Sequence, residues 1–201
     1  GVQWMTAGSG IVHEEMPEQE NGLLRGLQLW VNLPSSLKMM PPRYQDISPA
    51  QIPESVTGDG VRVRAIAGHV ENITGPIVDI IVSPVLFDFT LPQQATYVLP
   101  VSSAHTVFAY VLQGAVAFGE KGAKQTPSGH VVLLGDGDTV KARAGGDGGR
   151  FILAAGEPIR EPIAWRGPVV MNTEDEVTRA FDEYRKGTFV KARGAGMRVG
   201  R

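Results

Sequence analysis

The chain has 201 residues, 42% of them hydrophobic and 20% charged, which is enough to fold into one large domain or two small ones. Nineteen basic and twenty-one acidic residues give a formal net charge of −2, so no overall positive field is available to attract nucleic acid or anionic lipid. Cysteine is absent, which excludes disulfides, thiolate metal sites and cysteine nucleophiles and suits a reducing compartment.

The chain begins at Gly1 rather than at an initiator methionine, and residues 2–5 already have the pattern of a strand. We therefore expect a fragment, or a chain whose beginning was not included.

No apolar run approaches the roughly 20 residues that span a bilayer, and the first residues lack the basic-then-apolar order of a signal peptide. We expect a soluble protein of the cytoplasm, and of the nucleus as well if the source is eukaryotic.

Short β-branched runs recur along the chain, separated by the 25 glycines and 14 prolines, a rhythm typical of an antiparallel sandwich or barrel. Their number is too large for one small sandwich and suits two packed barrels. The runs predict strands at residues 2–5, 27–32, 61–67, 78–82, 86–91, 96–101, 107–113, 115–119, 130–134, 138–142 and 151–155.

Glycine and proline also predict the connections between these strands. Gln113 with Gly114, and Asp136 with Gly137, tolerate positive φ between apolar runs, so each pair predicts a tight reversal. Residues 145–149 read GGDGG and predict a flexible surface loop. Residues 33–54 contain five prolines, which interrupt strand pairing and favour an interdomain connection.

One helix is predicted, from about residue 173 to 186. Thr173 and Glu176 have the spacing of a capping box, and Gly187 suits the left-handed C-terminal cap. The residues expected on its apolar face, which should dock on a barrel, are Val177, Ala180, Phe181 and Tyr184.

His13 and Glu15 are the candidate metal ligands. Residues i and i+2 of a strand project from the same face, which would place an imidazole beside a carboxylate. Two donors are too few for tight binding, because non-haem iron or manganese takes three or four nitrogen and oxygen ligands. Taken alone, the pair fits solvated polar residues better than a metal site.

Several segments resemble the pirin family. Residues 3–17 read QWMTAGSGIVHEEMP, residues 27–33 read LQLWVNL, and residues 156–162 and 167–173 read GEPIREP and GPVVMNT. The resemblance covers both ends of the chain. It implies a mainly β bicupin fold, two antiparallel β-barrel cupin domains with the first incomplete, followed by a short C-terminal helix.

The domains implied are the remainder of an N-terminal cupin barrel with the proline-rich connection (1–45), a C-terminal cupin barrel (46–172), and a helix with a tail (173–201). The resemblance also implies one mononuclear iron in the N-terminal barrel, held by three His and one Glu, of which only His13 and Glu15 carry over. The other two ligands belong to a His-x-His motif that would precede Gly1. Other divalent metals also suit such ligands.

Other sites have weaker support in the sequence. In the second barrel, Val101, Ser103 and Val107 occupy the metal-ligand positions and form no credible ligand set. His69, His105 and His130 are expected to be hydrogen-bonded structural residues. No phosphate-binding loop precedes a helix, and no serine has a nucleophile elbow around it.

Two functions remain open. Some pirins oxidise the flavonol quercetin, which implies an iron-dependent quercetin 2,3-dioxygenase for the complete protein, with Glu15 as ligand and catalytic base and His13 as ligand. The alternative is a redox-sensitive regulator that binds a transcription factor or a metabolic enzyme.

An incomplete barrel would also expose sheet edges and apolar surface, so we expect a bound N-terminal fragment or a dimer. Direct binding to nucleic acid or membrane is not expected.

Overall fold

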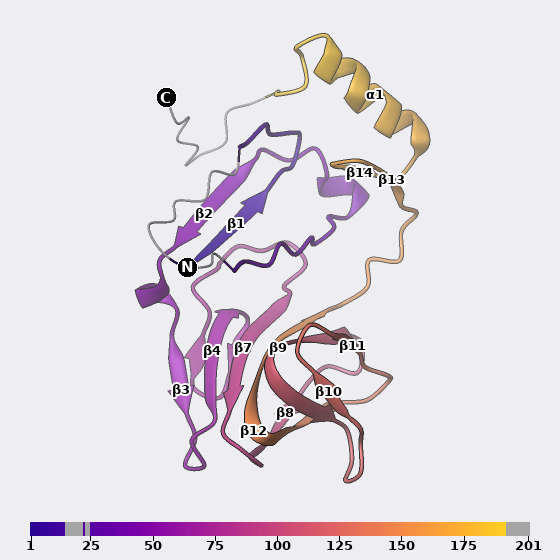
Figure 1. The fold of residues 1–201 in the computed structure, drawn as a ribbon. Helices are drawn as coiled ribbons and strands as arrows, with labels where there is room; N and C mark the ends of the chain where they lie inside the picture. The colour runs from indigo at the N-terminus through magenta and orange to yellow at the C-terminus, as the bar shows by residue number, and fades with distance from the viewer. Residues whose placement is uncertain (15–21, 23–24, 192–201) are drawn as a thin grey trace. The chain divides into compact units, whose positions relative to one another are not determined.

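The computed structural model describes residues 1–14, 22 and 25–191 of the chain (Figure 1). The described residues are mainly β with a single α-helix, as predicted. The strands are Val2–Thr6 (β1), Arg43–Ile47 (β2), Glu54–Val56 (β3), Arg62–Ala67 (β4), His69–Val70 (β5), Ile73–Thr74 (β6), Val85–Leu91 (β7), Thr96–Pro100 (β8), Thr106–Phe118 (β9), Gln125–Pro127 (β10), Val131–Leu133 (β11), Thr139–Gly156 (β12), Ala164–Arg166 (β13) and Val169–Met171 (β14). The helices are the 3-10 turns Ser35–Leu37 (η1) and Pro49–Gln51 (η2) and the α-helix Glu174–Arg185 (α1).

By packing, the chain divides into two compact units. Unit 1 consists of Gly1–Gln3 and Asp46–Pro158, and unit 2 consists of Trp4–Gln45 and Ile159–Arg201. Unit 2 therefore combines an early segment of the chain with its C-terminal part and includes β13, β14 and α1. The predicted segments 1–45, 46–172 and 173–201 divide the chain by family domain, and that division stays a prediction.

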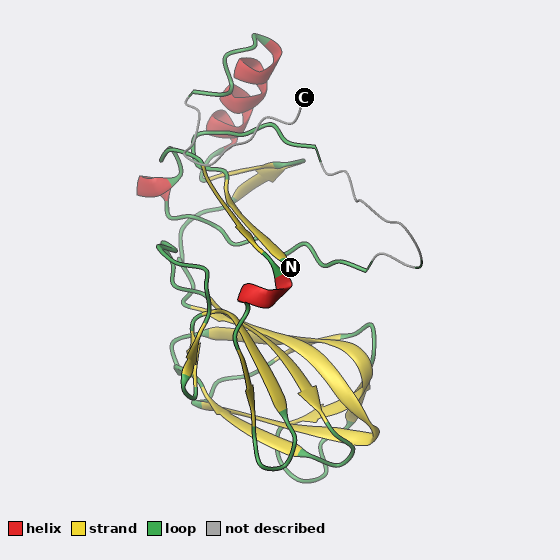
Figure 2. Ribbon diagram, turned by 90° about the vertical axis from the view of Figure 1, so that its left-hand side faces the viewer, coloured by secondary structure: helices red, strands yellow, loops and turns green. Residues whose placement is uncertain are grey.

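Unit 1 is built on one antiparallel sheet in the order β10-β9-β12-β7-β4-β3, with β11 paired to β9 and β8 paired to β12. Figure 2 shows these strands curving around a common interior. The short strands β5 and β6 form a separate two-stranded sheet in the same unit.

The interior of unit 1 follows from the two-residue repeat of its strands. Along β7, Phe87, Phe89 and Leu91 are buried at every second position, because alternate side chains of a strand face the same side. Phe89 stacks on Phe151 of β12 with ring centroids 4.9 Å apart. Asp88 is also buried, and Arg150 of β12 pairs with it.

The predicted reversal at Gly114 and the predicted loop at residues 145–149 are both wrong. β9 runs through Gly114 without a turn, and β12 runs through residues 145–149 with a register shift between Ala144 and Gly149. At Gly114 the φ is 65°, and an added Cβ would lie 2.2 Å from the carbonyl oxygen of Gly148. The glycines therefore allow two long strands to approach closely at a bulge.

Other strand predictions had mixed outcomes. Those at 2–5, 61–67, 86–91, 96–101 and 130–134 are confirmed as β1, β4, β7, β8 and β11. Those at 27–32 and 78–82 are wrong, since no strand forms there. The strands missed by the sequence pattern are short, namely β2, β3, β5, β6, β10, β13 and β14.

In unit 2, helix α1 begins as predicted. The Thr173 hydroxyl accepts a hydrogen bond from the backbone N–H of Glu176 at 3.2 Å, and the Glu176 carboxylate accepts one from the backbone N–H of Thr173 at 2.9 Å. Gly187 follows the helix with a φ of 70°. The helix packs on the hairpin of β13 and β14 (Figure 1). Of its expected apolar face, Val177 is buried and Tyr184 is exposed.

Among the described residues, no helix has both the length and the apolar character needed to cross a membrane.

Candidate functional site

A tight turn leads from β1 to the predicted ligand segment. The backbone N–H of Gly10 donates to the Ala7 carbonyl at 3.0 Å, and that of Ser9 donates to the Met40 carbonyl at 2.8 Å. Gly8 has a φ of 53°, and an added Cβ would lie 2.2 Å from the Met40 carbonyl oxygen. Only glycine fits this position, so Gly8 is what allows the chain to turn here.

His13 lies beyond this turn, on an exposed segment that forms no strand. Residues 11–14 form no strand, and the expectation that His13 and Glu15 project from one face stays a prediction. Glu15 lies outside the described residues, so its distance from His13 is not defined by the structure.

The donor chemistry of this pair fits a non-haem metal, because imidazole nitrogen and carboxylate oxygen are the ligands that iron and similar divalent ions accept. These two donors alone are fewer than the three or four that such an ion takes. Within residues 1–14, 22 and 25–191, no group of three or more His, Asp or Glu side chains could hold a metal ion. Assignment of His13 and Glu15 as ligands stays a prediction.

Two other histidines have hydrogen-bond partners on unit 1. The Nδ1 atom of His69 lies 2.9 Å from the Thr74 hydroxyl, and that of His130 lies 3.1 Å from the carbonyl oxygen of Ser128. Both contacts agree with the prediction of hydrogen-bonded structural residues.

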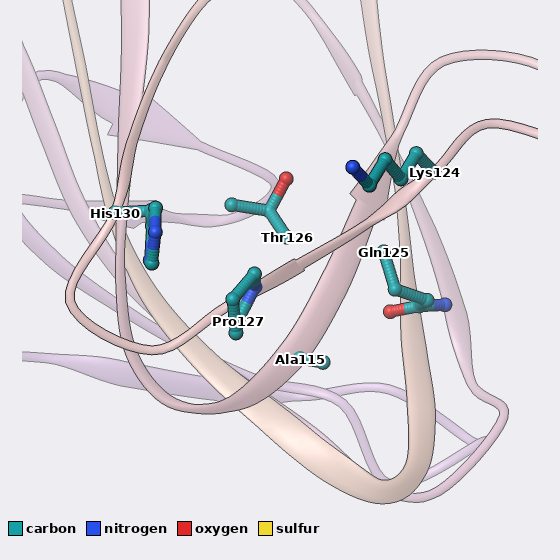
Figure 3. A pocket seen from close by; sticks show the side chains of 6 residues that line it. All are labelled: Ala115, Lys124, Gln125, Thr126, Pro127 and His130. Atoms are coloured by element: carbon teal, nitrogen blue, oxygen red, sulfur yellow. The ribbon is translucent and has the colours of Figure 1, made fainter.

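A hollow of about 540 Å³ lies beside strand β10 of unit 1 (Figure 3). The Oε1 atom of Gln125 is buried there without a hydrogen-bond partner among the described residues. A buried acceptor of this kind calls for a donor such as an ordered water. The sequence gives no signal for the hollow, since its lining comes from three separate segments: Ala115, Lys124, Gln125, Thr126, Pro127 and His130.

Unit 2 contains a buried lysine that the sequence pattern did not single out. Lys38 is only 6% exposed, and its ammonium donates to Asn32 Oδ1 at 2.6 Å and to the Val170 carbonyl at 3.4 Å. Burial lowers the pKa of Lys38, and the nearby carboxylates of Glu161 and Glu176 partly oppose this shift. Lysine is seldom buried, so composition gave no reason to expect it here.

Glu161, which lies near Lys38, joins distant parts of the chain. Glu161 Oε2 accepts hydrogen bonds from the backbone N–H of Ser35 at 2.7 Å and from the Asn172 side-chain amide at 3.0 Å. These bonds, led by that from Ser35, lower the pKa of Glu161. Asn172 also donates to the Pro162 carbonyl at 2.9 Å. The cluster is therefore a structural link within unit 2.

Comparison with known proteins gives a consistent result. Two family models match the chain, one described as Pirin over residues 1–31 and one described as the pirin C-terminal cupin domain over residues 86–190. A pirin-like protein of Caulobacter vibrioides is 44% identical over 190 residues, which cover 94% of this chain and 67% of that protein. Pirin of Mus musculus is 40% identical over 204 residues, which cover 99% of this chain and 69% of that protein.

A solved structure with the same fold is a quercetin 2,3-dioxygenase from Acinetobacter baumannii, with a TM-score of 0.74 and 31% identity over 80% of this chain. The present chain covers 55% of that structure's chain and about two thirds of the two relatives named above. These matches confirm the cupin-like, mainly β fold predicted from the sequence. Family models at both ends, together with about 40% identity over nearly the whole chain, establish that the protein belongs to the pirin family.

Proposed function

We propose that the complete protein is an iron-dependent oxidoreductase of the quercetin 2,3-dioxygenase type, to which this chain contributes His13 and Glu15. One observation carries the proposal: the pirin family model matches residues 1–31, which contain both side chains. The likeness to a quercetin 2,3-dioxygenase structure, at 31% identity, adds support. The absence of cysteine suits a cytoplasmic, reducing setting.

In this proposal His13 acts only as a ligand, whereas Glu15 is a ligand and also accepts the proton of a substrate hydroxyl. Two further histidines, expected ahead of the chain from the family resemblance, complete the ligand set. Iron, if held by these residues, would supply the Lewis-acid and redox chemistry for the reaction of an enol-ketone substrate with dioxygen. The turn held between Ser9 and Met40 fixes where the ligand segment starts.

The test is quercetin oxidation by the complete protein loaded with ferrous iron, followed by flavonol absorbance and oxygen uptake, with bound iron measured on each sample. We expect His13→Ala to lose iron and Glu15→Ala to lose turnover by about a hundredfold or more. The matched control is Glu14→Ala, which removes a neighbouring exposed carboxylate and should leave turnover unchanged. Equal turnover in the Glu15→Ala variant and the parent would show that Glu15 has no catalytic role.

A second candidate, partner binding, is favoured by an exposed aromatic pair in unit 2. Trp30 and Trp165 are 55% and 67% exposed, and their ring centroids lie 5.9 Å apart. Leu29, Val31 and Ile163 are exposed near them in sequence. Exposed clusters of large apolar side chains mark interaction surfaces, and tryptophan is enriched among the residues that contribute most to binding. We propose that this surface takes a protein: the remainder of the first barrel, a second copy, or a regulated partner.

Sedimentation velocity and intact mass test this candidate on the purified chain. We expect dimers or a retained N-terminal fragment, and we expect Trp165→Ser to weaken the association. Leu133→Ser is the matched control, because Leu133 is 71% exposed on β11 of unit 1. A monomer of the chain's own mass would count against both occupants. For a regulatory partner, equal affinity for the ferrous, ferric and iron-free protein would exclude a redox switch.

A further inference from the structure

A hollow of about 420 Å³ in unit 2 is lined by basic and aromatic side chains. Its lining consists of Arg166 from β13 and of Thr178, Phe181 and Arg185 from α1. The three helical residues are spaced i, i+3 and i+7, so they form one stripe along the helix. The helix packs on the hairpin that carries Arg166 (Figure 1). The hollow is therefore made by two elements that are held against each other.

Arg166 is positioned in this hollow by two contacts. Its guanidinium carbon lies 4.9 Å from the centroid of the Phe181 ring, and its Nη2 atom donates to the Thr178 hydroxyl at 3.2 Å. In the part of the chain that the structure describes, no carboxylate pairs with Arg166. A guanidinium has five N–H donors, so most of those of Arg166 remain available for a ligand.

The second guanidinium of the hollow belongs to Arg185. It forms an ion pair with Asp182 of the same helix, and its side chain is still 73% exposed. Of the two arginines, only Arg185 has a carboxylate partner, so the side chains that line the hollow carry an excess of positive charge. Guanidinium groups bind phosphate oxygens through two parallel hydrogen bonds, and a hydroxyl such as that of Thr178 can add a third.

We infer that this hollow binds a phosphate monoester. The stacking of Arg166 on Phe181 holds its donors in place before a ligand arrives, which reduces the entropy lost on binding. The phosphate group can be carried by a small molecule or by a phosphorylated side chain of a partner protein. The inference does not rest on the proposed oxidation, because none of its residues takes part in that reaction.

Isothermal titration calorimetry tests the site on the whole chain, with phenyl phosphate as the small-molecule probe and a short phosphoserine peptide as the other. We expect saturable binding at one site per chain that weakens as salt is raised. Arg166→Gln should weaken binding by at least about tenfold, and Arg166→Lys should weaken it less, because the charge is kept while the paired donors are lost.

The matched control is Arg62→Gln in unit 1, an exposed arginine paired with Glu54, which should bind both probes like the parent. If Arg166→Gln proves unfolded by circular dichroism, Arg185→Gln takes its place, with an expected loss of several-fold. Tighter binding of the peptide would identify a phosphoprotein partner, and equal binding a small phosphate ester. No saturable binding, unchanged binding in both variants of the hollow, or an equal loss in Arg62→Gln would each overturn the inference.

Discussion

The ion pair between Arg150 and Asp88 in unit 1 allows a quantitative prediction about stability. Arg150 donates from Nε to Asp88 Oδ1 at 3.0 Å and from Nη2 to Oδ2 at 2.7 Å. The hydrogen bonds to Asp88 raise the pKa of Arg150. The side chain of Asp88 is 9% exposed and that of Arg150 is 38% exposed. The two partners are therefore not equivalent. If Asp88 were removed, solvent could hydrate the guanidinium of Arg150, whereas removal of Arg150 would leave the carboxylate of Asp88 buried.

Replacing Arg150 by Met leaves the Asp88 carboxylate buried without its partner, a change that typically costs about 3–5 kcal/mol. We therefore expect a loss of about 3–5 kcal/mol in the free energy of unfolding. Adding Asp88→Leu to Arg150→Met removes the buried carboxyl altogether and should recover most of the loss.

Urea unfolding followed by far-UV circular dichroism, with amide hydrogen exchange in β7 and β12, measures these changes. Tryptophan fluorescence separates the units, because all three tryptophans, Trp4, Trp30 and Trp165, belong to unit 2. The matched control is Arg62→Met, which breaks an exposed pair and should cost less than about 1 kcal/mol. A cost below about 1 kcal/mol for Arg150→Met would refute the reasoning.

Three further predictions concern single residues. Gly8→Ala should destabilise unit 2 by about 2–4 kcal/mol in urea, since the added methyl meets the Met40 carbonyl and the positive φ is strained; a loss below about 1 kcal/mol would contradict this. Backbone hydrogen bonds lower the pKa of Glu176, so its contribution to the free energy of unfolding is present above pH 4.5 and is lost as the pH falls below that value. Glu176→Gln should therefore make the free energy of unfolding less dependent on pH in the acid range, and an unchanged dependence would exclude this role. Burial, reinforced by the hydrogen bond to Glu71, raises the pKa of Tyr97, so this tyrosine should be the last to ionise when absorbance at 295 nm is followed on alkaline titration. That last step should be absent in Tyr97→Phe, and its persistence would contradict the assignment.

The fold could be predicted from the sequence where its cause is local. The start of α1 depends on Thr173 and Glu176, three residues apart, and the buried repeat of β7 depends on every second residue. Gly114 was misread because its role depends on the carbonyl of Gly148 on another strand. No local pattern distinguishes a glycine that ends a strand from one that lets two strands approach.

The candidate sites also differ in whether a local sequence pattern or packing between elements brings their residues together. His13 and Glu15 could be proposed as ligands because they belong to one short motif, although residues 11–14 form no strand. Arg166 was not singled out, because its stacking on Phe181 joins β13 to α1. Distances between residues on different elements depend on packing, which a single sequence does not specify.

The composition of unit 2 from both ends of the chain has a consequence for biosynthesis. The bond between Ser35 and Glu161 joins residues 126 positions apart. Most of unit 1 is the continuous stretch Asp46–Pro158, which can fold as soon as it leaves the ribosome. The ligand segment near His13 is translated before that stretch, whereas the residues that complete its unit are translated after it. A ribosome that stops before residue 159 would therefore release a folded sheet attached to an N-terminal segment that has not yet acquired its packing partners.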